Sequence, residues 1–349
     1  MPNVSFEQLA TTTLRMHRPE MADNITGKQA AIIQMKQRGF VEEEEGSLSL
    51  VEPIMFDENS TVGSYRDWDD IDQTPQDGMT SAEFQWAQLA GSLMISGRQE
   101  FINSGNRTRI INLLTAKTTQ LQKSLKMLIN RQSHGDGTLN FGKDLTGFAA
   151  LVESGAGALW SLVGGVDSQT DQWWRNQWMD FDAFLTNAAG LSYANAQDNQ
   201  EFQRAMGTMV NSAMRDGERT TLILCDQMVH EYFESTMTRL ETYNKMGKMA
   251  DAAMGNAGLI ALYFKDIPVV MDDDMPGFDL TAGSNGHEML GLNNDYLHLK
   301  IGKGKNFTIT PFVRPPNQDG KIAQILFYAN YTIANRQRQW RMTNINFAP

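Results

Sequence analysis

The longest regular pattern of apolar positions lies between Asn106 and Gln132. Its apolar side chains recur at steps of four, seven, four and three residues, which is the spacing of one helix face. They are Ile110, Leu114, Leu121, Leu125 and Leu128. At 1.5 Å per residue, such a helix is about 40 Å long. Gly135 and Gly137 mark its end. The pattern therefore predicts one long helix that serves as a spine.

A second pattern predicts a long β-hairpin. Apolar and polar residues alternate over 46–56 and again over 82–86, as in two strands that each bury one face. The intervening residues 57–78 are rich in Asp, Gly, Ser, Thr and Pro, so they cannot form a core of their own. Three large apolar side chains nevertheless lie among them: Tyr65, Trp68 and Ile71. Exposed aromatic side chains on a projecting loop indicate a partner surface.

The rest of the chain mixes helical and strand patterns. Helices are expected at about 25–40, 196–215 and 226–241, and strands at 221–225 and 267–271. Strands that alternate with helices are typical of an α/β domain. The last stretch has strand composition, and its one-face residues, which we expect to pack beside the long helix, are Ile325, Phe327, Ala329 and Tyr331.

The acidic residues gather in one segment of the chain. Residues 41–80 hold twelve acidic residues and one basic residue, Arg66, and thus carry the whole formal net charge of −11. Residues 98–132 are basic, with seven Lys and Arg residues against Glu100 alone. The two segments are either complementary surfaces on neighbouring copies, since opposed potentials register an interface, or the acidic one is a solvated face.

Carboxylates are the only candidates for metal chemistry. Asp272, Asp273 and Asp274 could hold a divalent cation with Asp279 or Glu288. Consecutive side chains point in different directions, and Pro and Gly follow, so a solvated turn is the favoured interpretation. The His-Glu pair at 287–288 lacks the second His of a zincin, so no metal site is expected.

Other kinds of chemistry find little support. The chain has no P-loop and no complete dinucleotide fingerprint, and its one cysteine, Cys225, ends an apolar strand and reads as a core residue. Trp173, Trp174 and Trp178 either form a ligand platform or pack between loops, and packing is favoured. Neither a secretory signal nor a membrane span is expected. A neutral body with an acidic arm does not suit sequence-specific DNA binding.

Four strings, in this order, carry a resemblance to a known family. They are EFQWAQLAGSLMISGRQEFINSG at 83–105, GGVDSQTDQWWRN at 164–176, TLILCDQMVHEYFE at 221–234 and FKDIPVVMDDDMPG at 264–277. Together with the order of the predicted elements, they resemble the major capsid proteins of tailed bacteriophages with the Hong Kong 97 fold. The resemblance extends over residues 40–349.

The resemblance implies an α+β fold divided into five parts. These are an N-terminal arm at 1–40, an extended hairpin loop at 41–97, the spine helix of a peripheral domain at 98–137, an α/β axial domain at 138–304, and strands returning to the peripheral domain at 305–349. It implies no enzyme activity, catalytic residue, cofactor or metal.

The implied function is structural. The chain would assemble as pentamers and hexamers into an icosahedral shell that encloses double-stranded DNA, in a virion built in the host cytoplasm. A separate scaffolding protein, a portal and a decoration protein are the expected partners, and no membrane is involved. No lysine lies between Lys36 and Lys117, so covalent cross-linking through the hairpin is not expected. The rival interpretations are an encapsulin-like compartment that stores an enzyme, and a metal-dependent enzyme that uses the acids at 272–288.

The acidic hairpin would then lie on the basic helix of a neighbouring copy. The residues expected at this interface are Tyr65, Asp67, Trp68, Asp69, Asp70, Asp72, Arg107, Arg109, Lys117, Lys123 and Lys126.

Overall fold

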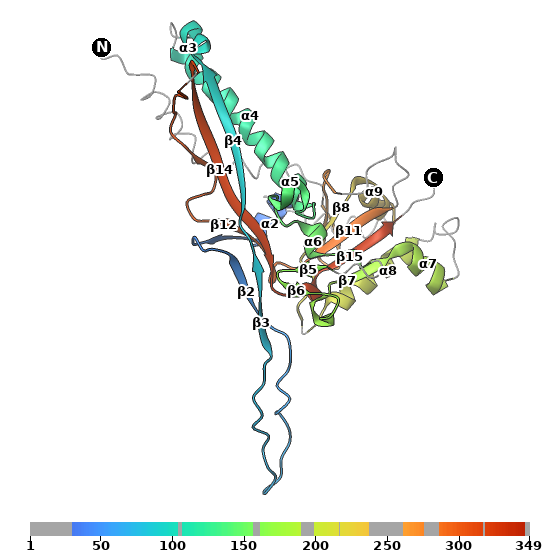
Figure 1. The fold of residues 1–349 in the computed structure, drawn as a ribbon. Helices are drawn as coiled ribbons and strands as arrows, with labels where there is room; N and C mark the ends of the chain where they lie inside the picture. Colours follow the sequence, from blue (N-terminus) through green and yellow to red (C-terminus); the bar gives the residue numbers. More distant parts are fainter. Residues whose placement is uncertain are drawn as a thin grey trace.

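A computed structural model describes residues 30–103, 107–155, 161–189, 199–215, 217–236, 261–275, 286–316 and 318–345. Within these residues the fold is α+β, as expected. It consists of a five-stranded sheet with a long helix on it, a six-stranded sheet flanked by shorter helices, and a two-stranded hairpin that projects away from both (Figure 1).

The spine is the helix α4, Arg107–Ser133, which lies on the longest strand pair in the fold. β4 (Ala87–Ser96) runs antiparallel to β14 (Gly320–Ile333), from the pair Ala87 and Ala329 to the pair Ser96 and Gly320. α3 (Gly97–Asn103) joins β4 to this helix. The predicted long helix and last strand are therefore confirmed.

The buried face of α4 differs in part from the predicted stripe. Leu125 and Ile129 are buried, whereas Leu128 is 37% exposed. The helix covers only one face of the sheet and lies close to it at Gly91, where a Cβ atom would lie 2.6 Å from Leu121 Cδ1. Polar Thr118 and Gln122 are also buried on this face. The spacing of apolar residues alone therefore did not predict the buried face of the helix correctly.

The remaining strands of this sheet bind part of the acidic segment. β1 (Val41–Glu44) pairs in parallel with β12 (Leu297–Gly302), which pairs with β14, and β13 (Thr308–Ile309) lies beyond β14. Lys300 Nζ lies 2.7 Å from Glu52 and 3.5 Å from Glu44. Several acidic residues at the start of the segment are thus paired with basic side chains of the same chain.

The six-stranded sheet is covered on both faces. Its order is β7 (Gln177–Asp180), β15 (Trp340–Ile345), β11 (His287–Leu292), β8 (Leu222–Cys225), β10 (Ile267–Met271) and β9 (Ala261–Phe264). Its helices are α7 (Phe181–Ala189), α8 (Asn199–Ala213) and α9 (Gln227–Thr236). Ile223 packs with α8 and α9, while Leu224 faces the core shared with the spine. This two-sided burial explains why β8 reads as an unbroken apolar run.

Short elements connect the two sheets. They are α2 (Ala30–Gln37), α5 (Leu139–Gly142), α6 (Phe148–Leu151), β5 (Leu162–Val163), β6 (Val166–Asp167), and the 3-10 turns η1 (Gln172–Trp174) and η3 (Arg336–Arg338).

Three stretches lie in other sheets than the sequence placed them. β4 belongs to the five-stranded sheet and not to the hairpin, β12 lies outside the α/β part, and β15 lies inside it. Alternating burial predicts that a segment is a strand but does not name its partner, which is set by side chains distant in sequence. The division into domains stays a prediction.

A buried arginine holds the corner between β14 and β15. Arg336 is fully buried, and its guanidinium lies 2.8 Å from a carboxylate oxygen of Glu153. It also donates to Leu151 O at 2.8 Å and to Ser168 Oγ, and lies 5.9 Å from the Trp174 ring centroid. Four segments therefore meet on one side chain.

Replacing Arg336 should strongly destabilise the chain. Arg336→Met leaves the buried Glu153 carboxylate without its counter-charge, which costs about 3–5 kcal/mol. Chemical denaturation should show a lower midpoint, and adding Glu153→Leu should recover part of the loss. The exposed Arg66→Met serves as control, with a change within about 0.5 kcal/mol. Equal effects at the two arginines would contradict the role of the buried pair.

Candidate functional site

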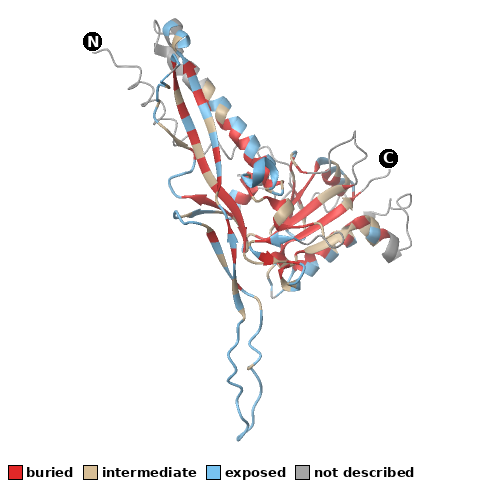
Figure 2. Ribbon diagram, in the orientation of Figure 1, coloured by how far each residue is buried: buried red, intermediate tan, exposed pale blue. Residues whose placement is uncertain are grey.

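Beyond its two paired strands, the projecting hairpin contributes little to the core of its own chain, which makes it a candidate for contact with another molecule. β2 (Leu50–Met55) pairs with β3 (Met79–Phe84) from Leu50 opposite Phe84 to Met55 opposite Met79, which confirms the predicted strands. Beyond this ladder, residues 57–78 extend from the body as two arms and a tip (Figure 1). Almost every residue of the arms is exposed (Figure 2).

The tip is a defined turn that presents aromatic side chains to solvent. The backbone N–H of Asp69 donates to Arg66 O, and the backbone N–H of Arg66 donates to the Asp69 carboxylate, both at 2.8 Å. Asp67 between them has a φ of 25°. Trp68 is 97% exposed and Tyr65 is 69% exposed. An exposed Trp ring does not gain the favourable free energy of burial. The tip is therefore suited to contact with another surface, where the ring would be buried.

Hydrogen bonds favour the ionised form of one carboxylate near the tip, that of Asp72. Thr74 donates from its hydroxyl and from its backbone N–H to Asp72, and these hydrogen bonds hold the pKa of Asp72 below its usual value. Asp67, Asp69 and Asp70 are exposed beside it. The expected acidic and aromatic residues are thus brought together at one end of the hairpin.

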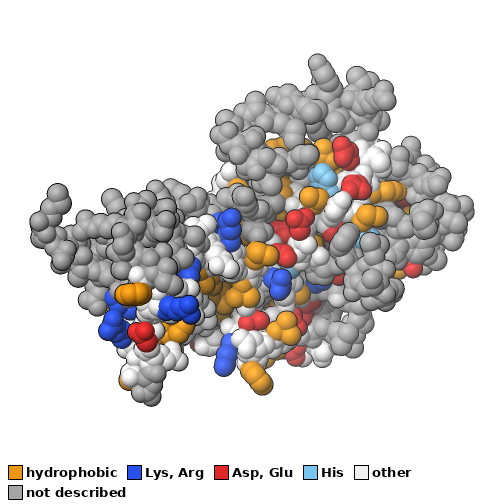
Figure 3. Space-filling model, turned by 90° about the horizontal axis from the view of Figure 1, so that it is seen from above, with side chains coloured by type: hydrophobic (Ala, Val, Ile, Leu, Met, Phe, Trp, Pro, Cys, Tyr) orange, Lys and Arg blue, Asp and Glu red, His pale blue; other side chains and the backbone are white. Residues whose placement is uncertain are grey.

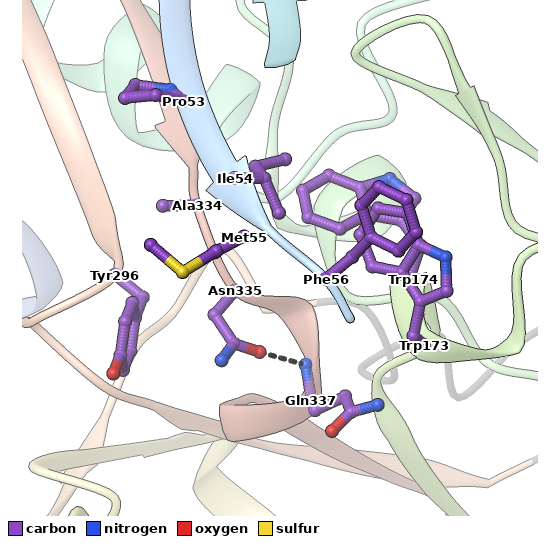
Figure 4. A pocket seen from close by; sticks show the side chains of 10 residues that line it. All are labelled: Pro53, Ile54, Met55, Phe56, Trp173, Trp174, Tyr296, Ala334, Asn335 and Gln337. Atoms are coloured by element: carbon purple, nitrogen blue, oxygen red, sulfur yellow. Dashed lines mark hydrogen bonds between the residues drawn. The ribbon is translucent and has the colours of Figure 1, made fainter. Parts of the chain in front are cut away.

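The base of the hairpin rests on the loop that carries the two adjacent tryptophans. Phe56 stacks on Trp173 with ring centroids 4.9 Å apart and planes 18° from parallel (Figure 4). The N–H of Glu83 donates to Gly164 O at 2.9 Å, and a Cβ at Gly164 would lie 2.7 Å from that of Ala82. Beside the stack lies a pocket of about 320 Å³ that reaches Tyr296, Asn335 and Gln337.

The string from Gly164 to Asn176 is therefore a packing unit. Trp174 is buried and donates from Nε1 to Val163 O at 3.0 Å, and Trp178 donates to Thr343. Asn176 donates to the carbonyl of Glu153 and accepts from its backbone N–H. This confirms the packing interpretation of the tryptophans.

The basic segment offers fewer lysines than the sequence suggested. Lys123 is exposed, but Lys117 donates to Met94 O and Gln99 Oε1, both at 2.9 Å. Lys126 is buried at 9% exposure, so its expected place in a surface contact is wrong. It lies on the face of α4 that packs on the body. The side chains of Arg107 and Arg109 lie outside the described residues.

A shallow groove runs between α4 and β4. It has a volume of about 320 Å³ and is lined by Ser92, Leu93, Met94, Lys117, Gln120, Leu121 and Ser124. Lys and Arg side chains gather at this end of the molecule, seen from above in Figure 3. The groove therefore combines an apolar floor with positive charge.

The sequence predicted a solvated turn at 272–274, but the structure buries part of this turn. Asp272 is buried and accepts from Asn130 Nδ2 at 2.9 Å, and His134 Nε2 lies 3.6 Å from it. Asn130 also donates to Asp274 at 2.7 Å. The turn thus joins the end of the spine helix to the six-stranded sheet. Burial alone would raise the pKa of Asp272, but His134 and the hydrogen bonds to Asp274 and Asn130 outweigh it and lower the pKa.

The candidate catalytic groups do not converge. Glu288 pairs with Arg341 at 2.5 Å, and His287 contacts Asp226. Cys225 is buried, and burial raises the pKa of its thiol, which makes it a core residue as expected. Asp279 lies outside the described residues. Among the described residues, no three His, Cys, Asp or Glu side chains are arranged to hold a metal ion, and no helix is long and apolar enough to cross a membrane.

One exposed turn is not indicated by any pattern in the sequence. In α5, Asn140 (φ 53°) and Phe141 (φ 61°) are both in the left-handed region, at a cost of about 1–2 kcal/mol per residue. Phe141 is 95% exposed. Only the following Gly142 hints at such a backbone, and a phenylalanine gives no sign of it.

Comparison with known proteins shows the fold. No protein-family model matches the chain, and no curated protein matches its sequence. The structure is similar to the capsid asymmetric unit of cyanophage A-1(L), with 16% identity and a TM-score of 0.61 over 89% of this chain and 92% of that one. It is similar to the capsid of an empty GTA particle, with 13% identity and a TM-score of 0.55 over 90% of both chains.

A third similar structure is the capsid of cyanophage P-SCSP1u, with 12% identity and a TM-score of 0.52 over 92% of this chain and 90% of that one. The three likenesses extend over nearly the whole chain. The expected Hong Kong 97-type capsid fold is thus confirmed.

Asp272 should stabilise the chain in a pH-dependent way. Its folded pKa lies below the ordinary 3.8, so its contribution is present above pH 3.8 and is lost as the pH falls through the folded value. Asp272→Asn should therefore lower the free energy of unfolding at pH 7, with a gap from the wild type that narrows below pH 3.8. Asp273→Asn, at an exposed neighbour, is the control. A gap that stays constant with pH would contradict the assignment.

Proposed function

We propose that the chain is the major capsid protein of a tailed bacteriophage, the subunit of an icosahedral shell that encloses double-stranded DNA. The observation that carries the proposal is the capsid fold, shared over about nine-tenths of the chain with cyanophage capsid structures. The work of such a subunit is assembly, so no catalytic residue, cofactor or metal has a role in it.

The exposed apolar residues of the chain support self-assembly. The hairpin leaves Val62, Tyr65, Trp68 and Ile71 at 60% exposure or more, far from any core of its own chain. Head-to-tail contacts between unlike surfaces of identical subunits close into rings. Rings of five and six copies would form the shell of the virion, assembled in the host cytoplasm.

Other partners follow from the same reading. A scaffolding protein would guide closure, a portal would admit the genome, and a decoration protein would stabilise the mature shell. DNA would be enclosed without sequence-specific binding, since the body outside the acidic segment is formally neutral and gains little from counterion release.

The hairpin tip is proposed to contact the groove between α4 and β4 of a neighbouring copy. The acidic and aromatic side chains would come from Tyr65, Asp67, Trp68, Asp69, Asp70 and Asp72, and the basic side chains from Arg107, Arg109, Lys117 and Lys123. Lys126 is omitted because it is buried. Trp68 would fill the apolar floor of the groove, and the carboxylates would set the register.

Electron microscopy of the purified chain, alone and with its candidate scaffold, tests the function. Closed shells or rings of five and six are expected. A monodisperse monomer under both conditions would refute the assembly proposal. Shells recovered from infected cells with double-stranded DNA inside would exclude an encapsulin-like compartment, whereas shells that enclose an enzyme would favour it.

Charge reversal tests the hairpin contact. Lys123→Glu should reduce shell yield without changing the melting temperature of the subunit, because Lys123 is exposed. Adding Asp70→Lys should restore part of the yield, since the pair then attracts again. Asp77→Lys, near the hairpin base, is the matched control that should not restore it. Normal shells from the single Lys123→Glu variant would rule out the contact.

A further inference from the structure

The turn at α5 carries two unfavourable features in the isolated subunit. Asn140 and Phe141 hold a left-handed backbone that L-residues avoid, and Phe141 and Leu139 are 95% and 69% exposed. The turn is nonetheless fixed at its start, where Asp136 accepts hydrogen bonds from the backbone N–H and the hydroxyl of Thr138 at 3.0 and 2.8 Å. A strained, anchored turn that points a phenyl ring at solvent is built to insert that ring elsewhere.

A second surface of the same chain is suited to receive it. The loop between β1 and β2 meets the end of β12 and the middle of β14 at a pocket of about 490 Å³. Its apolar lining comes from Trp86, Tyr328 and Leu48, of which Leu48 is 94% exposed. Trp86 is held in place because its Nε1 donates to Ser47 O at 3.0 Å. The pocket is therefore preformed and aromatic.

The charges around the turn and the pocket are complementary. In the sequence, Asp136 precedes the turn, and Lys143 and Asp144 follow it. Hydrogen bonds from Thr138 hold the pKa of Asp136 below its usual value. The pocket is lined by Lys303 and Lys305. The turn is thus net negative and the pocket wall net positive, although Glu45 pairs with Lys303 at 2.8 Å.

The two surfaces lie on opposite sides of the subunit. Figure 1 shows α5 on the flank of α4 that faces the six-stranded sheet, while the loop between β1 and β2 lies on the other side of the five-stranded sheet. A head-to-tail ring requires two unlike, complementary surfaces on opposite sides of each copy.

We propose that the Phe141 turn of one subunit inserts into the pocket lined by Leu48, Trp86 and Tyr328 of the next copy around a ring. The contact rests on the proposed function, because it needs a ring of copies. It is separate from the hairpin tip and the groove beside α4, and it would explain why a strained turn is kept at an exposed position.

Variants at the turn separate its side chain from its backbone strain. Phe141→Gly and Phe141→Asn remove the ring and suit a left-handed backbone. The subunit should keep or raise its melting temperature, while the concentration needed for shells rises about tenfold or more, as for loss of a central contact. Asn140→Gly relieves strain but keeps the ring, and should assemble as the wild type does.

Cysteine pairs locate the contact directly. Leu48→Cys with Phe141→Cys should form disulfides between copies in assembled shells, seen as a ladder up to hexamers on a non-reducing gel. The native Cys225 is buried and gives no background. The control pair, Leu48→Cys with Phe101→Cys, joins the pocket to another exposed phenylalanine and should give no ladder.

The outcomes distinguish this inference from the proposed function. If the wild-type chain forms no shells under any condition, both fall together. If the wild type forms shells, and Phe141→Gly forms them equally well or the cysteine pair gives no ladder, the inference fails and the function stands. A ladder of equal strength from the control pair would also overturn it.

Discussion

The fold depends on the ion pair between Arg336 and Glu153. The guanidinium of Arg336 is fully buried. Its charge is stable there only because the Glu153 carboxylate and three further hydrogen-bond acceptors surround it. Those acceptors come from the end of α6, from the loop after β6, and from the turn that leads to β7. The pair therefore places the tryptophan loop against the corner where β14 leaves one sheet and β15 enters the other. The hairpin base rests on that loop through Phe56 and Gly164. The direction in which the hairpin projects therefore depends on the Arg336–Glu153 pair, although no hairpin residue takes part in it.

The sequence predicted elements wherever a local pattern decides the outcome. The spine helix, the strand over 221–225, the hairpin strands and the buried face of β14 all follow from the spacing of apolar side chains. Strand partners did not follow, because β15 and β12 have similar patterns and join different sheets. Register and partner depend on surfaces far apart in sequence.

The candidate site was predictable in part for the same reason. The aromatic and acidic tip of the hairpin could be recognised, because a segment without a core cannot bury Trp68. The burial of Lys126 and Asp272 could not be judged from the sequence, because it depends on tertiary packing. Lys126 lies on the face of the spine helix that packs on the body, and Asp272 packs against the end of that helix. Phe141 gave no sign at all, since its side chain does not indicate a left-handed backbone.

Among the described residues, the hairpin contacts the rest of the chain near its base, and this has a consequence for how such chains diverge. Substitutions between 57 and 78 should therefore have little effect on the folding of the subunit, and under the proposed contact the receiving surface of the neighbouring copy would be their main constraint. In related shells, changes in the arm should therefore accompany compensating changes in the receiving surface, while the residues around Arg336 vary little. The hairpin would then determine which subunits assemble together, and two otherwise similar subunits with different hairpins would fail to mix in one shell.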